Sequence, residues 1–460
     1  MTQKGFIKTV VLLVSLVMAT ASFAEGGRTP LRVKNGIVTS ASRLASQAGV
    51  DAMQAGGNAV DAAIATAFAL AVTLPTAGNI GGGGFMVYHG EDGDATTFDF
   101  REKAPLAATE RMFLGLDGNV VNNSNHMGAL SVGVPGTVAG LWKAHQERGS
   151  LPWEQLVAPA IKLAREGIPI SYSLQSGFLR NKSRFDLYPS SQQKFFKADG
   201  SSYELGELWV QEDLAHTLEL IQKNGRDGFY KGENARRLAD FMAANGGIIT
   251  EEDLEIYQPV EREPVRGTYR GYEIVSMPPP SSGGVALIQM LNILEGYDLG
   301  AMGHNSSAYL HVLTESMRRA YADRAEHLGD PDFNEAMPIA RLMDKDYAAK
   351  QRATIDMAKA DISDPSKFAE PYESEETTHF SVVDKDGNMV SMTYTLEYGY
   401  GSAIVVAGGG YLLNNEMGDF NAMPGVTNAR GAIGTAPNLV APQKRMLSSM
   451  TPTIVAKDGK

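Results

Sequence analysis

The sequence contains no cysteine and no block of basic residues. Without cysteine, the chain can form no disulfide bond and can have neither thiol catalysis nor a cysteine-bound zinc site. Its 41 basic and 53 acidic side chains give a net charge of −12, which disfavours binding to nucleic acid or to an acidic membrane surface. Chemistry on small molecules is the function class that remains.

Long apolar runs are also scarce, since the one near the N-terminus is short and no other follows it. Lys4 and Lys8 precede this run at residues 10–18, and small residues lead to Ala24. These features predict a secretory signal peptide over residues 1–24, with a retained anchor as the alternative. We therefore expect the mature protein in a bacterial periplasm or in the medium, and not in a membrane.

Several common catalytic motifs are missing. The sequence has no G-x-S-x-G elbow, no H-E-x-x-H helix and no G-x-G-x-x-G fingerprint. The glycine run at residues 81–84 lacks the Lys-Ser/Thr ending of a phosphate-binding loop, so a tight buried turn is predicted there. The run at residues 384–388 is too short for a calcium loop. No cofactor and no metal site is predicted.

A β-hairpin is predicted near the C-terminal end of the chain. Residues 380–383 and 389–395 are rich in Val, Thr, Tyr and Phe, and Asp386-Gly387 between them suits a tight turn. The acidic run at residues 373–376 leads into Thr377 at the entrance of the first strand. A boundary of this kind is a suitable place for the chain to cut itself.

Cleavage before Thr377 would leave an α-amine beside the threonine hydroxyl. Such an amine titrates near about 7.7–8.0, against about 10.4 for a lysine, so an appreciable fraction is neutral at neutral pH. An N-terminal amine is a recognised base for a threonine nucleophile. An ordinary hairpin that begins with threonine is the alternative interpretation.

The rest of the chain alternates predicted helices with strands. Residue patterns and stop signals predict the following elements. Helices are expected at residues 42–54, 58–73, 156–166, 214–223, 285–294, 308–328 and 345–361; strands at 97–100 and 269–275; a loop at 181–202; and a second hairpin at 453–460. The alanine-rich segment 58–73 carries so little charge that we expect it to be buried against a sheet.

Motifs spread along almost the whole chain resemble those of one enzyme family, the γ-glutamyltranspeptidases. They are G-G-N-A-V-D-A-A (56–63), G-N-I-G-G-G-G-F-M (78–86), D-F-R-E-K-A-P (99–105), S-V-G-V-P-G-T-V-A-G-L-W (131–142), M-P-P-P-S-S-G-G (277–284), T-T-H-F-S-V-V-D-K-D-G-N (377–388), T-Y-T-L-E-Y-G-Y-G (393–401), L-L-N-N-E-M-G-D-F (412–420) and K-R-M-L-S-S-M-T-P-T-I (444–454). So many motifs in one order make chance a poor explanation.

The resemblance implies an α+β fold, a four-layer αββα sandwich of the N-terminal-nucleophile hydrolase type. It also implies self-cleavage before Thr377 into a large subunit, residues 25–376, and a small subunit, residues 377–460, which form a heterodimer. The implied reaction transfers the γ-glutamyl group of amides such as glutathione through a threonine ester to water, an amino acid or a dipeptide.

The resemblance also implies roles for individual residues. Thr377 would be the nucleophile, its α-amine the base, and Thr395 a hydrogen-bonding partner that assists cleavage. Without the resemblance, Arg101 would be expected to lie at the surface and to pair with Asp99 or Glu102. Its guanidinium fork also suits the carboxylate of a substrate. The implied ligands are Arg101, Ser448 and Ser449 for the substrate carboxylate, and Glu397, Glu416 and Asp419 for its ammonium. Residues 424–439 correspond to the family's lid, with Arg430 where some relatives have an aromatic residue.

One departure from the family concerns the C-terminal end. The family's glycine pair, which supplies N–H groups to the oxyanion, lies beyond the position that corresponds to Lys460. The small subunit is therefore expected to be truncated, and loss of such donors typically costs about a hundredfold or more in rate.

Two alternatives remain open at this stage. A β-lactam side-chain acylase, acting on glutaryl or cephalosporin substrates, would use the same nucleophile with a different acyl pocket. A periplasmic amino-acid-binding protein would also be acidic, exported and equipped with arginine and acidic ligands, but it would have no reason to break before Thr377.

Overall fold

A computed structural model describes residues 32–361, 377–427 and 434–457 of the protein. The chain divides into two units, Met1–Asn35 and Gly36–Lys460, and the elements below belong to the second. The predicted leader, the acidic run before Thr377 and Arg430 lie outside the described residues.

The strands form antiparallel sheets. Their bounds are β1 Gly36–Thr39, β2 Gly83–His89, β3 Ala95–Phe100, β4 Ile168–Pro169, β5 Leu208–Trp209, β6 Val260–Arg262, β7 Val265–Tyr269, β8 Tyr272–Ser276, β9 Thr378–Asp384, β10 Met389–Thr395 and β11 Thr453–Ala456. A six-stranded sheet has the order β1-β9-β10-β2-β3-β6, a three-stranded sheet has the order β11-β8-β7, and β4 pairs with β5.

The described helices range in length from 4 to 21 residues. Their bounds are α2 Arg43–Gln54, α3 Ala59–Thr73, α4 Thr137–Arg148, α5 Trp153–Glu166, α6 Tyr172–Arg180, α7 Lys182–Phe185, α8 Pro189–Phe195, α9 Glu212–Asn224, α10 Asp227–Tyr230, α11 Gly232–Ala244, α12 Glu251–Ile256, α13 Gly283–Leu294, α14 Leu299–Met302, α15 Ser307–His327, α16 Ile339–Leu342 and α17 Lys345–Arg352. Short 3₁₀ turns occur at η1 Ala129–Ser131, η2 Glu416–Asp419 and η3 Ala436–Asn438.

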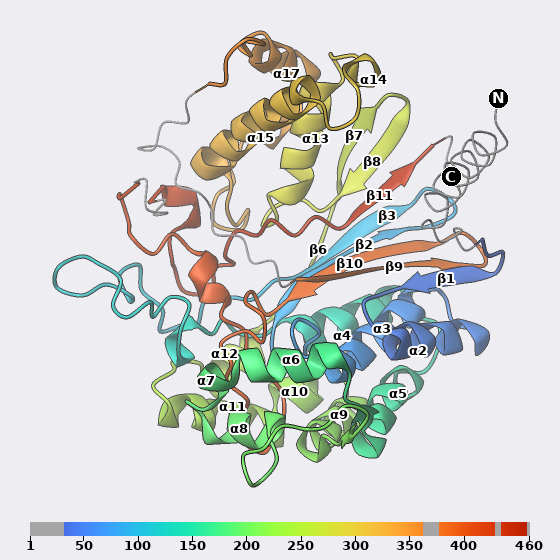
Figure 1. Cartoon of the computed structure of the whole chain (residues 1–460), viewed down its shortest axis with the longest axis vertical. Helices are drawn as coiled ribbons and strands as arrows, with labels where there is room; N and C mark the ends of the chain where they lie inside the picture. The colour runs from blue at the N-terminus through green and yellow to red at the C-terminus, as the bar shows by residue number, and fades with distance from the viewer. Residues whose placement is uncertain (1–31, 362–376, 428–433, 458–460) are drawn as a thin grey trace, which may run out of the picture. The chain divides into compact units, whose positions relative to one another are not determined.

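Two helical layers enclose the two larger sheets (Figure 1). Helices α2, α3 and α4 cover one face of the six-stranded sheet, with α5 packed on α3, and the other face of this sheet packs on the three-stranded sheet. Helix α13 covers the far side of the three-stranded sheet, and α15 packs on α13. Phe85 and Val87 of β2 meet Val275 and Ile454 between the sheets. This arrangement confirms the expected α+β fold with αββα layers.

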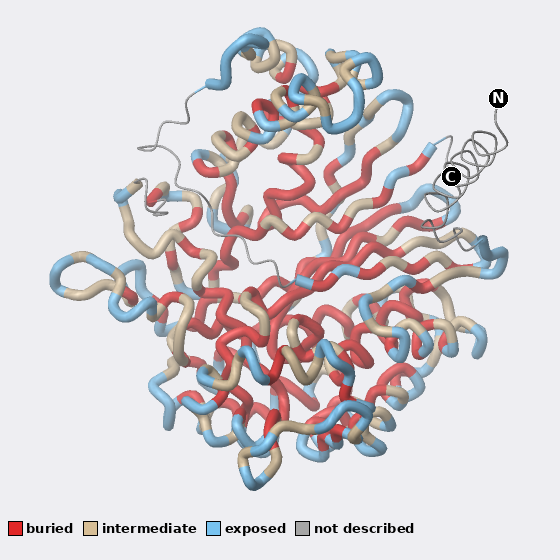
Figure 2. The backbone as a smooth tube through the Cα atoms, in the orientation of Figure 1, coloured by how far each residue is buried: buried red, intermediate tan, exposed pale blue. Residues whose placement is uncertain are grey.

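Helix α3 lies in the middle of the first helical layer, and Figure 2 shows it buried along its length. Every residue of the helix except Ala71 is buried. Asn58 caps it through a capping box with Asp61, which satisfies N–H groups at the helix start. Small side chains let neighbouring elements approach this helix closely. At Gly49 of α2, for example, a Cβ would lie 2.3 Å from Thr66 Oγ1 of α3. The prediction of a buried helix here is confirmed.

Several predicted elements differ from the structure. The glycine run at residues 81–84 is predicted as a tight turn, but Gly83 and Gly84 belong to strand β2. The single strand expected at residues 269–275 is a hairpin, β7–β8, which turns at Arg270-Gly271 with positive φ at both residues. The helix expected at residues 345–361 ends at Arg352. The loop expected at residues 181–202 contains α7 and α8, which are held by aromatic packing around Phe185 and Phe195.

Candidate active site

The hairpin β9–β10 brings Thr377 and Thr395 together. The two strands pair antiparallel with Tyr394 opposite Thr378, so Thr377 and Thr395 stand at facing ends of the ladder. The hydroxyl of Thr377 donates to Oγ1 of Thr395 at 3.3 Å. Gly387 in the connecting turn has a φ of 95°, which favours glycine. Hence the predicted hairpin is confirmed, and it places the two hydroxyl groups within hydrogen-bond reach.

The hairpin lies inside the six-stranded sheet, where β9 pairs with β1 and β10 pairs with β2. The glycine run provides the room for this pairing. A Cβ at Gly82 would lie 2.2 Å from the carbonyl oxygen of Thr395, and one at Gly84 would lie 2.4 Å from Cβ of Tyr394. Glycine is therefore needed here because the two backbones approach closely, not because a phosphate binds.

Asn79 fixes the end of β10, although nothing in the sequence singled it out. Its Nδ2 donates to the carbonyl of Thr395 at 2.9 Å, and its Oδ1 accepts from the Gly82 N–H at 3.0 Å. The Thr137 hydroxyl also donates to Oδ1, at 2.7 Å. The buried amide thus joins β10, the glycine run and the start of α4.

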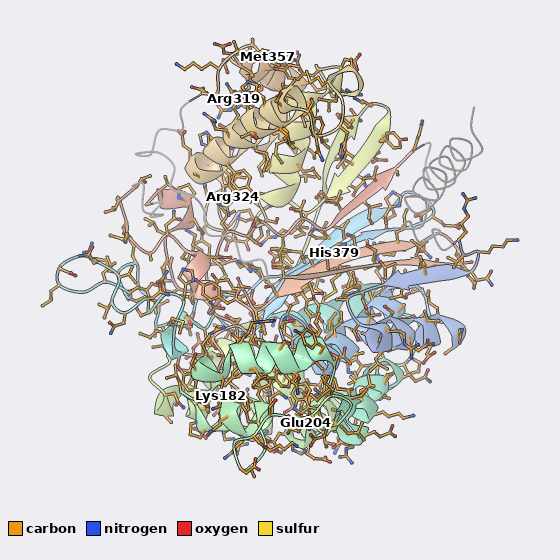
Figure 3. All side chains as sticks on the ribbon, viewed as in Figure 1. Lys182, Glu204, Arg319, Arg324, Met357 and His379 are labelled. Carbon is orange, nitrogen blue, oxygen red and sulfur yellow. The ribbon has the colours of Figure 1, made fainter. Side chains whose placement is uncertain are left out.

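A row of polar side chains continues from Thr377 along one face of the hairpin, because alternate residues of a strand share a face. His379, labelled in Figure 3, follows Thr377 in this row. Its Nδ1 lies 2.8 Å from Thr393 Oγ1 and its Nε2 lies 3.2 Å from Ser381 Oγ. Burial lowers the pKa of His379, so its imidazole is neutral at neutral pH.

Arg101 directly follows β3 and is almost completely buried. Its Nη1 lies 2.6 Å from Oε2 of Glu416, its Nη2 donates to Asp419, and its Nε donates to the carbonyl of Met446 at 3.3 Å. Burial alone would lower the pKa of Arg101, but the neighbouring carboxylates raise it above its usual value. The predicted ligands for carboxylate and for ammonium are thus in direct contact, not at separate ends of a pocket.

Acidic groups outnumber cations around this arginine. Glu102 is fully buried 3.6 Å from Nη1 of Arg101, and its carboxyl oxygens have no hydrogen-bond partner among the described residues. Burial raises the pKa of Glu102 to about 8, against the opposing effect of Arg101. Burial also raises the pKa of Glu416 well above its usual value. Glu102 therefore holds a proton at neutral pH.

Glu397 belongs to the segment that follows β10. It is buried, and its backbone has a φ of 75°, which is unusual for a residue with a side chain. Its N–H donates to Oγ1 of Thr395 at 2.9 Å, so Thr395 links Glu397 to Thr377. Oε1 of Glu397 lies 2.9 Å from Nδ1 of His126, a residue that the sequence analysis missed.

The segment with Ser448 and Ser449 rests on the turn before α13. The N–H of Ser448 donates to the carbonyl of Pro280, and the N–H and hydroxyl of Ser282 both donate to the carbonyl of Ser448, at 2.7 and 2.8 Å. Arg324, labelled in Figure 3, donates from Nε to the Ser282 hydroxyl at 2.8 Å. The serine pair is thus held through its backbone, and the hydroxyl of Ser448 accepts from the N–H of Met450 at 3.1 Å.

The similarity to known proteins covers nearly the whole chain. A family model described as gamma-glutamyltranspeptidase matches residues 45–460. The chain belongs to the γ-glutamyltranspeptidase family. It is 47% identical over 461 residues to the glutathione hydrolase proenzyme of Pseudomonas sp. (strain A14), a match that covers 100% of this chain and 80% of that protein.

Solved structures of related proteins agree with this membership. The γ-glutamyltranspeptidase of Helicobacter pylori matches with a TM-score of 0.70 and 47% identity, over 73% of this chain and 95% of that chain. A cephalosporin acylase from Bacillus halodurans matches with a TM-score of 0.79 and 29% identity, over 95% of this chain and 78% of that chain. The predicted resemblance and the N-terminal-nucleophile hydrolase fold are confirmed, and the amino-acid-binding alternative has no support.

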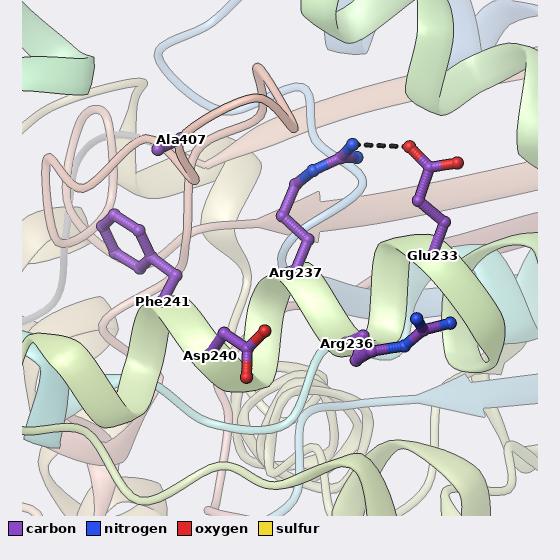
Figure 4. A pocket seen from close by; sticks show the side chains of 6 residues that line it. All are labelled: Glu233, Arg236, Arg237, Asp240, Phe241 and Ala407. Carbon is purple, nitrogen blue, oxygen red and sulfur yellow. Dashed lines mark hydrogen bonds and ion pairs between the residues drawn. The ribbon is translucent and has the colours of Figure 1, made fainter.

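A separate hollow of about 470 Å³ is lined by side chains of α11 and by Ala407 (Figure 4). One of the lining residues, Glu233, lies 2.6 Å from Nη2 of Arg237 and 3.0 Å from Nε2 of His216. No residue that lines it belongs to the family motifs around Thr377. His216 and Glu233 thus form a second histidine–glutamate pair, which lies outside the candidate site.

Two features are absent from the described residues. Among them, no group of three or more histidine, aspartate or glutamate side chains is arranged to hold a metal ion. None of the helices within the described ranges is long and apolar enough to cross a membrane.

Proposed function

We propose that the protein cuts itself before Thr377 and then transfers the γ-glutamyl group of amides such as glutathione to water or to an amino-acid or dipeptide acceptor. Membership of the family supports the reaction class. The observation that carries the assignment of the nucleophile is the 3.3 Å contact between the hydroxyl groups of Thr377 and Thr395. The proposed products are a large subunit, residues 25–376, and a small subunit, residues 377–460.

In the proposed self-cleavage, Oγ of Thr377 attacks the carbonyl carbon of the preceding residue. The C–O bond forms as the peptide C–N bond breaks, so the acyl group moves from nitrogen to oxygen and the amine is released with a proton. Water then hydrolyses the ester. Thr395 supports this step because its Oγ1 accepts the hydrogen of the Thr377 hydroxyl.

The released α-amine is the proposed base of the catalytic cycle. Oγ of Thr377 attacks the γ-carbonyl of the donor while the amine takes the hydroxyl proton and delivers it to the leaving amine. A γ-glutamyl ester remains on Thr377. Water or an acceptor amine attacks this ester, and the threonine hydroxyl is restored.

The charged cluster around Arg101 is the proposed binding site for the α-carboxylate and the α-ammonium of the donor. Arg101, Ser448 and Ser449 would bind the carboxylate, and Glu397, Glu416 and Asp419 the ammonium. A zwitterion brings one charge of each sign, so it can add to the existing ion pair of Arg101 and Asp419 without changing the net charge of this buried region.

Export is the remaining part of the proposal. Residues 1–24 have the composition of a signal peptide, and removal of this leader would release the enzyme to the periplasm or the medium. No metal or other cofactor enters the proposed mechanism.

Intact-mass spectrometry of the purified protein tests the cleavage. We expect two polypeptides, the smaller beginning at Thr377, and one uncut chain for Thr377→Ala. The wild type should release p-nitroaniline from γ-glutamyl p-nitroanilide, whereas Thr377→Ala should release none. Undiminished release by Thr377→Ala would refute the assignment of the nucleophile.

A matched substrate separates the acylase alternative. The glutaryl amide has the same chain as the γ-glutamyl amide but lacks the α-ammonium. We expect faster cleavage of the γ-glutamyl amide, because the proposed pocket offers carboxylates to the ammonium. A preference for the glutaryl amide would favour a β-lactam side-chain acylase.

A further inference from the structure

His126 approaches the candidate site from a loop that carries none of the family motifs around Thr377. Its ring stacks on Tyr398, with centroids 5.1 Å apart and planes at 12°. The side chain of Asn415 donates to its carbonyl at 3.3 Å. Gly418 leaves room for the ring, since a Cβ there would lie 2.1 Å from Nδ1. The imidazole is therefore fixed in place, with Nδ1 2.9 Å from Oε1 of Glu397.

We infer that His126 is a positioning residue, which holds the Glu397 carboxylate in the ionised form that the ammonium of a γ-glutamyl donor requires. The inference rests on the proposed function, because that function assigns the ammonium to Glu397. His126 lies outside the proposed donor-binding set. The proton that it shares with Glu397 moves between the two side chains when the donor binds.

The contact between the two side chains requires a shared proton. A nitrogen and an oxygen 2.9 Å apart form a hydrogen bond only if one of them carries the hydrogen. Both side chains are largely buried, with 16% of His126 and 5% of Glu397 exposed. Burial lowers the pKa of His126 and raises that of Glu397, so the neutral pair, with the proton on the carboxyl group, is favoured in the empty site.

A bound ammonium reverses this preference, because it is stabilised by an ionised Glu397. The imidazole then donates from Nδ1 to the carboxylate, and this hydrogen bond supports the charged form. Without the imidazole, the ionised carboxylate would lose that donor while it stayed buried. Glu397 would then ionise only at a higher pH, and the donor would bind weakly below that pH.

Other charges that face Glu397 act in both directions. The negative charges of Asp419 and Glu416 raise the pKa of Glu397, Arg101 lowers it, and Glu102 raises it further. Asp419 also favours the protonated form of His126. These groups are unchanged when His126 is replaced. A difference in pH profile between the wild type and a His126 variant therefore reports on the imidazole.

Two variants of His126 separate its hydrogen bond from its packing. His126→Phe keeps an aromatic ring against Tyr398 but removes Nδ1. His126→Asn restores a hydrogen-bonding amide near the Nδ1 position but cannot take up a proton. His216→Phe is the matched control, because His216 also pairs with a glutamate, Glu233, at 3.0 Å, outside the candidate site.

The readout is kcat/KM for γ-glutamyl p-nitroanilide as a function of pH, measured on variants whose cleavage is confirmed by intact mass. For His126→Phe we expect KM at neutral pH to rise about tenfold, with the acidic limb displaced upward by about one pH unit and kcat changed less than about twofold. His126→Asn should recover most of the KM change. His216→Phe should match the wild type. Superimposed profiles of His126→Phe and the wild type would overturn the inference.

A measurement on the wild type can refute the inference even if a variant fails to fold. L-glutamate and glutarate have the same chain, but glutarate has no ammonium. Competitive inhibition by L-glutamate should strengthen as the pH rises through the titration of the His126–Glu397 pair, whereas inhibition by glutarate should not strengthen. Parallel pH dependences would refute the inference. If the wild type cleaves no γ-glutamyl amide at all, the proposed function fails first, and this inference falls with it.

Discussion

The hydroxyl groups of Thr377 and Thr395 lie 3.3 Å apart at facing ends of strands β9 and β10. They are eighteen positions apart in the sequence, but a single hairpin brings them together. Oγ1 of Thr395 also accepts the N–H of Glu397. A hydroxyl with two donors directed at its oxygen is held in one orientation, which suits it to assist the attack by Thr377.

Replacing Thr395 by alanine should slow self-cleavage. Loss of the acceptor for the Thr377 hydroxyl costs about 1–3 kcal/mol, which corresponds to a rate about 5-fold to about 160-fold lower. The rate can be followed as the disappearance of the uncut chain on denaturing gels. Thr395→Ser keeps the hydroxyl and should cleave nearly as fast as the wild type. Equal rates for Thr395→Ala and the wild type would contradict this role.

Asn79→Ala should impair both stability and cleavage. The change removes the side chain that bonds the Thr395 carbonyl and the Gly82 N–H, so each of these buried groups loses that hydrogen bond. We expect the free energy of unfolding to fall by about 1–3 kcal/mol, with slower cleavage. The control is Asn224→Ala, whose exposed amide bonds only within its own helix turn, to Leu220. Equal effects of the two changes would show that Asn79 has no special role.

The buried carboxyl group of Glu102 predicts an unusual pH dependence of stability. Its pKa rises from 4.5 to about 8 in the folded protein, mainly through burial. Between these values the folded chain holds a proton that the unfolded chain has lost. Stability should therefore fall as the pH rises through this window, with a slope of up to about 1.4 kcal/mol per pH unit.

Glu102→Gln removes this titration and should flatten the pH dependence. Urea unfolding of the uncut chain, in the Thr377→Ala background, measures the effect without the complication of two subunits. If the free energy of unfolding had the same slope against pH with Glu102 and with Glu102→Gln, Glu102 would be ionised throughout the window.

Arg101→Met tests the ion pairs of the cluster. The change leaves the carboxyl groups of Glu416 and Asp419 without the cation that they contact, and we expect a loss of about 3–5 kcal/mol in the free energy of unfolding. The loss should be smaller at low pH, because the carboxyl groups can then be neutral. The matched control is Arg266→Met, which breaks an exposed pair with Glu273 and should cost less than about 1 kcal/mol. Similar losses for both variants would contradict the importance of burial here.

Elements whose signals lie in neighbouring residues could be predicted from the sequence. The hairpin β9–β10 has its strand formers and its turn within one short segment, and helix α3 has its Asn58 cap beside its apolar run. The β7–β8 hairpin was not predicted, because its turn at Arg270-Gly271 interrupts what reads as a single strand.

The contacts within the site depend on residues far apart in the chain, and no local pattern indicates them. Arg101 and Glu416 were both named from the resemblance, but their direct contact follows only from the folded arrangement of β3 and η2. His126 stands in a loop without periodicity, and a lone histidine gives no signal of its partner. Asn79 lies within a quoted motif, yet its role depends on β10, more than 300 positions later.

The position of β9 and β10 between β1 and β2 has a consequence for the lifetime of the cut enzyme. After the proposed cleavage, the small subunit would supply interior strands of a sheet whose neighbours belong to the large subunit, so the two could not separate without opening the core. Refolding of separated subunits would be a second-order encounter, whereas the precursor folds as one chain. The working life of the mature enzyme is therefore set by its unfolding rate, and a folding equilibrium governs only the precursor.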